Sequence, residues 1–325
     1  MFARIMVAAG ILAGSFSYGW AQYALPSVSV SSLRGTPGHA SELVSQAVMG
    51  TPLKILSRNG DWLRVETPEG YNGYVRSNTV EEMDTGRFGV WQRSPRVVVS
   101  ATDQTYVYDN DSIMTPSHRV TDVVPGCILA IEGYATPYSA TKVKLPDGRL
   151  GYIGNHDVTP LSEWAAMACD SAAVRLLEPA VTLMGTPYVW GGTSVKGMDC
   201  SGFTQLLFYR HGILLPRDAS QQARVGKEVF LRQDGSALDY GLLDVLKPGD
   251  LLFFGNRATR KVNHVGLYMG DGMVIHCSGR VKINRLLDGP GADASLYLLS
   301  ARRVEGEWVD SLSVASLPIY GLNNF

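Results

Sequence analysis

The sequence is short of several features that would mark a particular class of protein. It has four cysteines in 325 residues, and none lies before residue 127. A lipid-anchored cysteine at the N-terminus is therefore excluded, and the spacing of the four forms neither a disulfide framework nor a CxxC metal motif. The net charge is −1 and no basic stripe appears, so nucleic acid is not an expected partner.

The chain also lacks an apolar run of the roughly 20 residues that a membrane-spanning helix needs. Its first residues instead have the composition of a secretory signal, with Arg4 before the short apolar stretch from Ile5 to Phe16 and a cleavage site expected near Ala21. We expect a signal peptide over residues 1–22 and an exported, soluble, monomeric mature protein, either periplasmic or secreted. The alternative is a buried N-terminal helix.

The four cysteines are Cys127, Cys169, Cys200 and Cys277. In an exported protein Cys127 and Cys169 are able to form a bridge, although single buried thiols are the simpler interpretation. If Cys200 is catalytic, it must remain a free thiol.

An internal repeat covers two segments in the first half of the chain. Residues 65–75 read Val-Glu-Thr-Pro-Glu-Gly-Tyr-Asn-Gly-Tyr-Val, and residues 143–153 read Val-Lys-Leu-Pro-Asp-Gly-Arg-Leu-Gly-Tyr-Ile. In each copy a strand ends at the valine, Pro-acid-Gly makes a turn, and the Gly-Tyr pair opens the next strand. Val80 and Val158 follow at matching offsets. The repeat predicts two small β-barrels, over residues 23–85 and 86–161.

After Thr159 the pattern changes to helices followed by strands. Helical spacing covers the segments from Ser162 to Leu183 and from Ser201 to Tyr209. Strands are expected at residues 249–254, 264–269 and 273–277. This order predicts an α+β domain over residues 162–325.

Cys200 stands where a reactive thiolate is easily made. Gly191, Gly192 and Gly197 permit tight turns before it, and Asp199 is suited to cap a helix that starts near Cys200. The positive end of such a helix would lower the pKa of the thiol, and its unpaired N–H groups would bind an oxyanion. The alternative is a buried structural cysteine.

Two histidines occupy a predicted hairpin and suit the general base that a thiol nucleophile needs. His264 and His276 flank the tip Gly270-Asp271-Gly272. A three-residue loop puts His276 opposite Gly266, on the same face as His264 and within side-chain reach, whereas a two-residue loop puts the histidines on opposite faces. His264 is then the base and His276 orients it. Two structural histidines, or a zinc site with Cys277, are the alternatives; strand alternation argues against zinc because Cys277 points away.

Three motifs together resemble the NlpC/P60 cysteine peptidases. They are Pro187-Tyr188-Val189-Trp190-Gly191-Gly192 … Met198-Asp199-Cys200-Ser201-Gly202-Phe203, then Leu246-Lys247-Pro248-Gly249-Asp250-Leu251-Leu252-Phe253-Phe254, then Asn263-His264-Val265-Gly266-Leu267-Tyr268-Met269-Gly270. The resemblance implies a papain-like α+β fold whose cysteine-bearing helix packs on a histidine-bearing sheet. It also implies cleavage of the γ-D-glutamyl–diaminopimelate bond in cell-wall peptides, with no cofactor.

The first repeat copy resembles a bacterial SH3 (SH3b) domain through Leu33-Arg34, Ser41-Glu42-Leu43-Val44-Ser45-Gln46 and Gly60-Asp61-Trp62-Leu63-Arg64-Val65. The second copy lacks the Gly-Asp-Trp element and is only SH3b-like. The segment around Glu42 is similar to the branch of the family that cuts γ-D-glutamyl-L-diamino-acid bonds in muropeptides with a free N-terminal L-alanine.

That resemblance implies further site residues. Tyr188 would line the oxyanion region, while Asp199 and Ser201 would hold the substrate stem. Glu42, Asp199 and one of two tyrosines would bind the substrate ammonium; the two candidate tyrosines are Tyr71 and Tyr74. For Glu42 the alternative is a solvated loop charge.

Three functions remain open from the sequence. The first is an endopeptidase that trims soluble muropeptides for murein recycling. The second is a hydrolase of intact peptidoglycan that uses its SH3b domains as binding modules. The third is a non-catalytic wall-binding protein on a decayed peptidase fold, against which the presence of Cys200, His264 and His276 argues.

Overall fold

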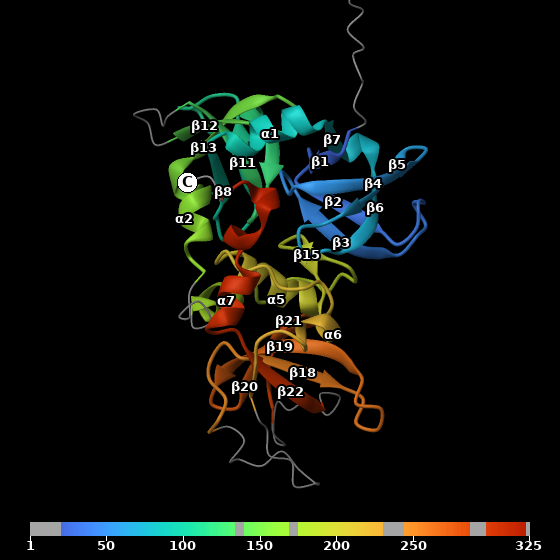
Figure 1. Ribbon diagram of the computed structural model, residues 1–325. Coiled ribbons are helices and arrows are strands. Elements are labelled where there is room, and N and C mark those ends of the chain that lie inside the picture. The colour runs from blue at the N-terminus through green and yellow to red at the C-terminus, as the bar shows by residue number, and fades with distance from the viewer. Residues whose placement is uncertain (1–20, 134–139, 169–174, 230–243, 287–296, 323–325) are drawn as a thin grey trace, which may run out of the picture.

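The computed structural model describes residues 21–133, 140–168, 175–229, 244–286 and 297–322. Two all-β units lie side by side at one end of the molecule, and a third unit of helices and strands lies at the other (Figure 1). The expected signal peptide falls almost wholly on residues 1–20, outside the described residues. No helix within the described ranges has both the length and the apolar character needed to cross a membrane.

The first unit is a seven-stranded antiparallel sheet in the order β3-β2-β6-β5-β4-β1-β7. Its elements are β1 (Tyr23–Pro26), β2 (Val30–Arg34), β3 (Leu43–Val48), β4 (Leu53–Asn59), β5 (Trp62–Glu66), β6 (Asn72–Arg76), η1 (Ser77–Thr79) and β7 (Val80–Met83). A helix, α1 (Thr85–Arg93), leads to the second unit; Asp84 caps it by accepting from the Arg87 N–H at 2.8 Å.

The second unit repeats the first strand for strand, in the order β10-β9-β13-β12-β11-β8-β14. Its elements are β8 (Arg96–Val99), β9 (Thr105–Tyr108), η2 (Pro116–His118), β10 (Arg119–Val123), β11 (Ile128–Gly133), β12 (Ala140–Lys144), β13 (Leu150–Gly154), η3 (Asn155–Asp157) and β14 (Val158–Pro160). The predicted Pro-acid-Gly hairpins are confirmed, because they join β5 to β6 and β12 to β13. The turn glycines Gly70 and Gly148 have φ values of 83° and 89°, which other residues rarely adopt.

The third unit is α+β, as predicted. Its strands form the hairpin β15 (Thr193–Ser194) with β16 (Gly197–Met198), and a sheet in the order β17-β22-β18-β19-β20-β21. The sheet strands are β17 (Lys227–Val229), β18 (Leu251–Gly255), β19 (Val262–Gly270), β20 (Met273–Ser278), β21 (Arg280–Arg285) and β22 (Leu298–Arg303). The helices are α2 (Leu161–Ala165), α4 (Leu177–Thr182), α5 (Cys200–Tyr209), α6 (Ala219–Gln222), α7 (Glu307–Leu312), η5 (Val314–Ser316) and η6 (Pro318–Tyr320).

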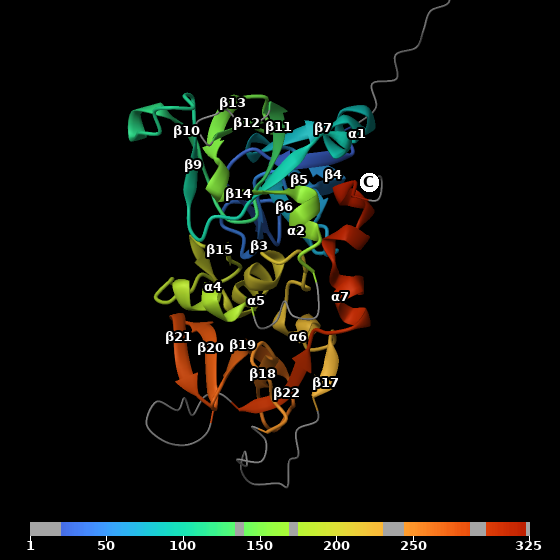
Figure 2. The same ribbon diagram turned by 90° about the vertical axis from the view of Figure 1, so that its left-hand side faces the viewer.

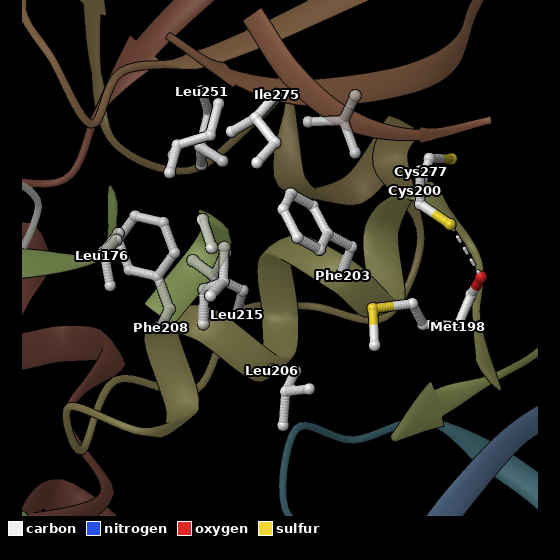
Figure 3. Packing of buried hydrophobic residues seen from close by; sticks show 14 of the residues in the cluster. Leu176, Met198, Cys200, Phe203, Leu206, Phe208, Leu215, Leu251, Ile275 and Cys277 are labelled. Atoms are coloured by element: carbon white, nitrogen blue, oxygen red, sulfur yellow. Dashed lines mark hydrogen bonds between the residues drawn. The ribbon is translucent and has the colours of Figure 1, made fainter. Parts of the chain in front are cut away.

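Helix α5 is the centre of the third unit, between its sheet and the β units (Figure 2). All of its residues are buried. Phe203 and Phe208 join Leu251 and Ile275 of the sheet in one apolar cluster (Figure 3). Leu207 belongs to the same cluster. Each such side chain contributes about 1.5–3 kcal/mol when fully buried, so the helix that begins at the cysteine is held firmly against the sheet.

The helix predicted from Ser162 to Leu183 is wrong as a continuous element. Helix α2 ends at Ala165 and α4 begins at Leu177, and residues 169–174 lie outside the described residues. The Trp164 indole, 1% exposed, donates to the Tyr209 carbonyl at 2.9 Å. This tertiary contact fixes α2 against the end of α5, which the local spacing could not indicate.

The first β unit is packed directly on the loop that precedes α5. Thr193 and Ser194 of β15 donate to the Gln46 side chain of β3 at 2.9 and 3.2 Å. Gly191 has a φ of 77°, and a Cβ there would lie 2.3 Å from the Leu43 carbonyl oxygen, so only glycine allows this approach. Residues of the first unit are thereby brought to the start of α5.

Candidate active site

Cys200 is the first residue of α5, and Asp199 is its N-cap. The Asp199 Oδ1 accepts from the Gly202 N–H at 2.7 Å, and the Phe203 N–H bonds to the Asp199 carbonyl at 2.9 Å. Within the described residues, the N–H groups of Cys200 and Ser201 donate to no oxygen. Neither amide has an oxygen acceptor in that part of the chain, so both are able to bind an oxyanion beside the sulfur, toward which the Ser201 amide already points.

The Asp199 carboxylate is locked in place by a buried arginine. Arg217, 2% exposed, reaches Asp199 Oδ1 and Oδ2 at 3.1 and 2.5 Å. The Gly191 N–H and the Ser201 hydroxyl donate to the same carboxylate at 3.0 and 3.2 Å. Ser201 in turn accepts from Arg217 at 2.9 Å. Asp199 thus has its hydrogen-bonding capacity filled from inside the protein, and Arg217 is a site residue that the sequence did not reveal.

The pKa of the Cys200 thiol is raised, whereas the sequence predicted a lowered pKa. Its side chain is 7% exposed. Burial, and then the nearby Asp199 carboxylate, raise the pKa of the Cys200 thiol to about 11, although the backbone amides of Val265 and Ser201 favour the thiolate. The helix N-terminus therefore does not produce a standing thiolate, and a base must take the proton as the sulfur reacts.

The two predicted histidines are joined directly. His264 Nε2 lies 2.7 Å from His276 Nδ1, and the rings meet edge to face with centroids 5.0 Å apart. The Val265 amide, next to His264 on β19, lies near enough to the Cys200 sulfur to lower the pKa of the thiol. The structure therefore gathers Cys200, His264 and His276 at one place.

The histidines share a face, but not because of a three-residue loop. Strands β19 and β20 pair Leu267 with Ile275, and the register then shifts between Tyr268 and Gly270. A two-residue turn, Asp271-Gly272, therefore joins the strands. The register shift is a β-bulge, and its one extra residue returns the His264 and His276 side chains to the same face of the sheet. The expectation that a two-residue loop separates the histidines is wrong because it assumed an unbroken ladder.

Asn284 completes the chain of polar groups and was missed by the sequence reasoning. Its Oδ1 lies 2.8 Å from His276 Nε2. It sits on β21, where it pairs with Val274, diagonally across from His276. Pairing residues 273–278 with the next strand through a turn at Gly279 would have predicted Asn284 to lie beside His276.

Tyr188 lies at the edge of the same site. Its backbone N–H bonds to the Gly279 carbonyl at 2.9 Å, and it bridges to Met198, just before Asp199. Burial, followed by the electrostatic effect of the neighbouring Cys200 group, raises the pKa of the Tyr188 phenol well above its usual value. The hydroxyl therefore stays protonated and is able to donate a hydrogen bond.

Glu42 is exposed to solvent and has one hydrogen-bond partner in the third unit. It accepts from the Trp190 indole at 2.7 Å, a contact between the first β unit and the loop before α5. The pKa of the Tyr71 phenol is raised. The largest cause is burial, followed by the nearby Asp218 carboxylate; Glu42 adds to the increase, and the Arg217 charge opposes it. Among the described residues, no hydrogen bond joins Tyr74 to this group.

Asp218 is a further acidic side chain that the sequence reasoning missed. Burial raises the pKa of the Asp218 carboxyl, against the Arg217 charge and a hydrogen bond from Tyr71. It directly follows Arg217, the partner of Asp199, so its place at the site could not be inferred before that ion pair was known.

Cys277 and Cys127 are buried free thiols. Cys277 donates to the Met198 carbonyl at 3.1 Å (Figure 3), and burial raises the pKa of the Cys277 thiol to about 12. Cys127 is a buried free thiol, and Cys169, its expected partner, lies outside the described residues. Across the part of the chain that the structure describes, no cluster of three or more His, Cys, Asp or Glu side chains is placed to hold a metal ion.

Comparison with protein families gives two matches. Residues 185–296 match the NlpC/P60 family, and residues 29–81 match the bacterial SH3 domain. The first match contains Cys200, His264, His276 and Asn284, and the second contains Glu42 and Tyr71.

Individual proteins and structures are similar over most of the chain. A gamma-D-glutamyl-L-lysine dipeptidyl-peptidase of Bacillus cereus is 30% identical, over 73% of this chain and 68% of that protein. Dipeptidyl-peptidase 6 of Lysinibacillus sphaericus is 27% identical, over 79% of this chain and 89% of that protein. The crystal structure of an NlpC/P60 family protein from Bacillus cereus superimposes with a TM-score of 0.69 at 25% identity, covering 86% of this chain and 99% of that one.

Proposed function

The chain belongs to the NlpC/P60 family, and on that premise we propose that it is a cysteine peptidase that hydrolyses the γ-D-glutamyl bond to a diamino acid in cell-wall muropeptides. The observation that carries the proposal is the cluster of Cys200, His264 and His276 beside two amides at a helix N-terminus that have no oxygen acceptor among the described residues. The named activity of the Bacillus cereus relative supports the bond type.

The reaction is an acyl transfer through the cysteine. The Cys200 sulfur attacks the γ-carbonyl carbon of D-glutamate while His264 takes the thiol proton. The oxyanion is stabilised by the amides of Cys200 and Ser201, with the Tyr188 hydroxyl beside them. His264 then gives its proton to the leaving amine, which leaves a thioester. A water molecule, activated by His264, hydrolyses the thioester and restores the thiol.

The first β unit supplies the pocket for the substrate amine. Besides burial, the Asp218, Glu42 and Asp199 carboxylates each raise the pKa of the Tyr71 phenol, so negative charge gathers around Tyr71, and Asp199 is itself paired with Arg217. Because Asp199 is already saturated by hydrogen bonds, Glu42 and Asp218 are the carboxylates best able to meet an ammonium directly. This favours muropeptides with a free N-terminal L-alanine, as in murein recycling. We propose that the protein is exported and meets them in the periplasm or outside the cell.

The proposal is tested by mass-spectrometric cleavage of three peptides. They are the free tripeptide L-Ala-γ-D-Glu-diaminopimelate, the same peptide with an acetylated N-terminus, and the free L-lysine analogue. Cys200→Ala is the blank, and Cys277→Ala controls for loss of a neighbouring buried thiol. Cleavage of the free peptides alone is expected. Equal cleavage of the acetylated peptide would show a general peptidoglycan hydrolase, and no cleavage above the blank would point to a wall-binding module.

The amine pocket has its own test. Glu42→Gln keeps the hydrogen bond from Trp190 but removes the charge, and it should raise KM for the free peptide at least tenfold, since charged hydrogen bonds contribute about 1.5–3 kcal/mol. Glu82→Gln, at a half-buried carboxylate of the same β unit that pairs with Arg58, is the matched control and should leave KM unchanged. An unchanged KM in Glu42→Gln would exclude Glu42 from substrate binding.

A further inference from the structure

His276 is hydrogen-bonded at both ring nitrogens. It is fully buried on β20, with His264 Nε2 2.7 Å from its Nδ1 and Asn284 Oδ1 2.8 Å from its Nε2. The three side chains come from three neighbouring strands, β19, β20 and β21. Hydrogen bonds connect them in a row from Asn284 through His276 to His264. His264 precedes Val265, whose backbone amide lowers the pKa of the Cys200 thiol.

The hydrogen-bonding chemistry of Asn284 determines which ring nitrogens of His276 and His264 carry hydrogen. An amide oxygen only accepts hydrogen bonds, so His276 Nε2 must carry a hydrogen. A neutral imidazole has one ring hydrogen, and Nδ1 of His276 is therefore an acceptor. His264 Nε2 must then donate to it, which leaves the lone pair of His264 on Nδ1. Each step follows from the one before, and the first is set by the orientation of the Asn284 carboxamide, which presents its Oδ1 to His276.

We propose that Asn284 is a positioning residue that fixes the tautomers of both histidines, so that His264 presents an unprotonated Nδ1 to the Cys200 thiol. This inference rests on the proposed function for its role in catalysis, but the tautomers themselves do not depend on the substrate. Because the pKa of the thiol is raised to about 11, the enzyme relies on a base that is ready to accept the proton. The opposite tautomer of His264 would direct a hydrogen at the thiol and could not serve.

Two substitutions at residue 284 separate positioning from packing. Asn284→Leu has nearly the same size but no acceptor, so both tautomers of His276 become accessible. Asn284→Asp keeps an oxygen that accepts from Nε2 and adds a negative charge. The titratable neighbours in the sheet are His264 and Lys282, which pairs with His276 across β20 and β21. Asn59→Leu, at an exposed strand end of the first unit, is the matched control.

The first measurement is ¹⁵N NMR of histidine-labelled protein, which distinguishes protonated from unprotonated ring nitrogens. In the wild type and in Asn284→Asp we expect His276 to carry its hydrogen on Nε2 and His264 to carry its own on Nε2. In Asn284→Leu we expect a mixture of tautomers. A wild-type His276 protonated on Nδ1 would overturn the proposal, whether or not any peptide is cleaved.

The second measurement is the pH profile of kcat/KM for the free tripeptide. Asn284→Leu should lose on the order of 10²-fold or more in kcat/KM, up to the cost of about 10⁴ known for a wrong tautomer. Asn284→Asp should retain the rate, with the acidic limb of the profile raised by about one pH unit because the carboxylate stabilises imidazolium. Equal losses in Asn284→Asp and Asn284→Leu, or a wild-type rate in Asn284→Leu, would refute the positioning role. If Asn284→Leu does not fold, the wild type and Asn284→Asp decide.

Discussion

The buried ion pair behind the cysteine gives the sharpest prediction for stability. Arg217 is 2% exposed and binds both oxygens of Asp199. Replacing it in Arg217→Met keeps the aliphatic stem but leaves a buried carboxylate without its cation. Breaking one partner of a buried pair costs about 3–5 kcal/mol. At roughly 2–4 °C per kcal/mol for a unit of this size, the melting temperature should fall by roughly 6–20 °C.

The matched control is the same substitution at an exposed pair. Arg149→Met removes a contact to Asp147 whose side chains are 45% and 29% exposed, and this should cost under about 1 kcal/mol. The assay is thermal unfolding followed by circular dichroism, with Asp199→Asn and the double variant completing a mutant cycle. The double variant should be less destabilised than the sum of the single ones. If Arg217→Met and Arg149→Met differ by less than about 2 °C, the pair does not hold the start of α5.

Two further outcomes concern the reacting groups. Gly266→Ala should lower kcat/KM on the order of 10²-fold, because the added Cβ would lie 2.7 Å from Val274 Cγ2 and 3.0 Å from His276 Cβ. The control Gly38→Ala, whose Cβ would have nothing within 4 Å, should have no effect on kcat/KM. Equal rates in the two variants would contradict the close packing at Gly266. Iodoacetamide labelling of Cys200 in the free enzyme should climb about tenfold per pH unit through pH 9, since the thiol, with its pKa raised to about 11, is still protonated there. A labelling rate that is flat between about pH 6 and 9 would instead show a preformed thiolate.

The parts of the fold that the sequence predicted are those specified by local chemistry. Pro-acid-Gly turns define their hairpins within a few residues, so the repeat and its two equivalent sheets were foreseen. The helix at Cys200 was foreseen for the same reason, since its cap at Asp199 precedes it directly. The bulge at Met269 was not, because it depends on how β19 fits its neighbours and not on any residue at the tip.

The site residues that were missed act across the fold. Asn284 reaches His276 diagonally between strands, and Arg217 reaches Asp199 from the segment that follows α5. The thiol pKa was misjudged for a related reason. A helix end is visible in the sequence, whereas the burial that outweighs it arises only when α5, the sheet and the preceding loop are packed together.

The two copies of the repeat show how one β unit was adapted to the site. In the second copy Asp147 pairs with Arg149 at an exposed turn. The first copy has Glu69 and Tyr71 at the equivalent positions, and both face the third unit. Glu69 lies 3.5 Å from the Gln205 side chain of α5, and burial raises the pKa of its carboxyl. Where one turn carries an exposed charge pair, the other carries groups that dock it on α5, which brings the first unit next to the candidate active site.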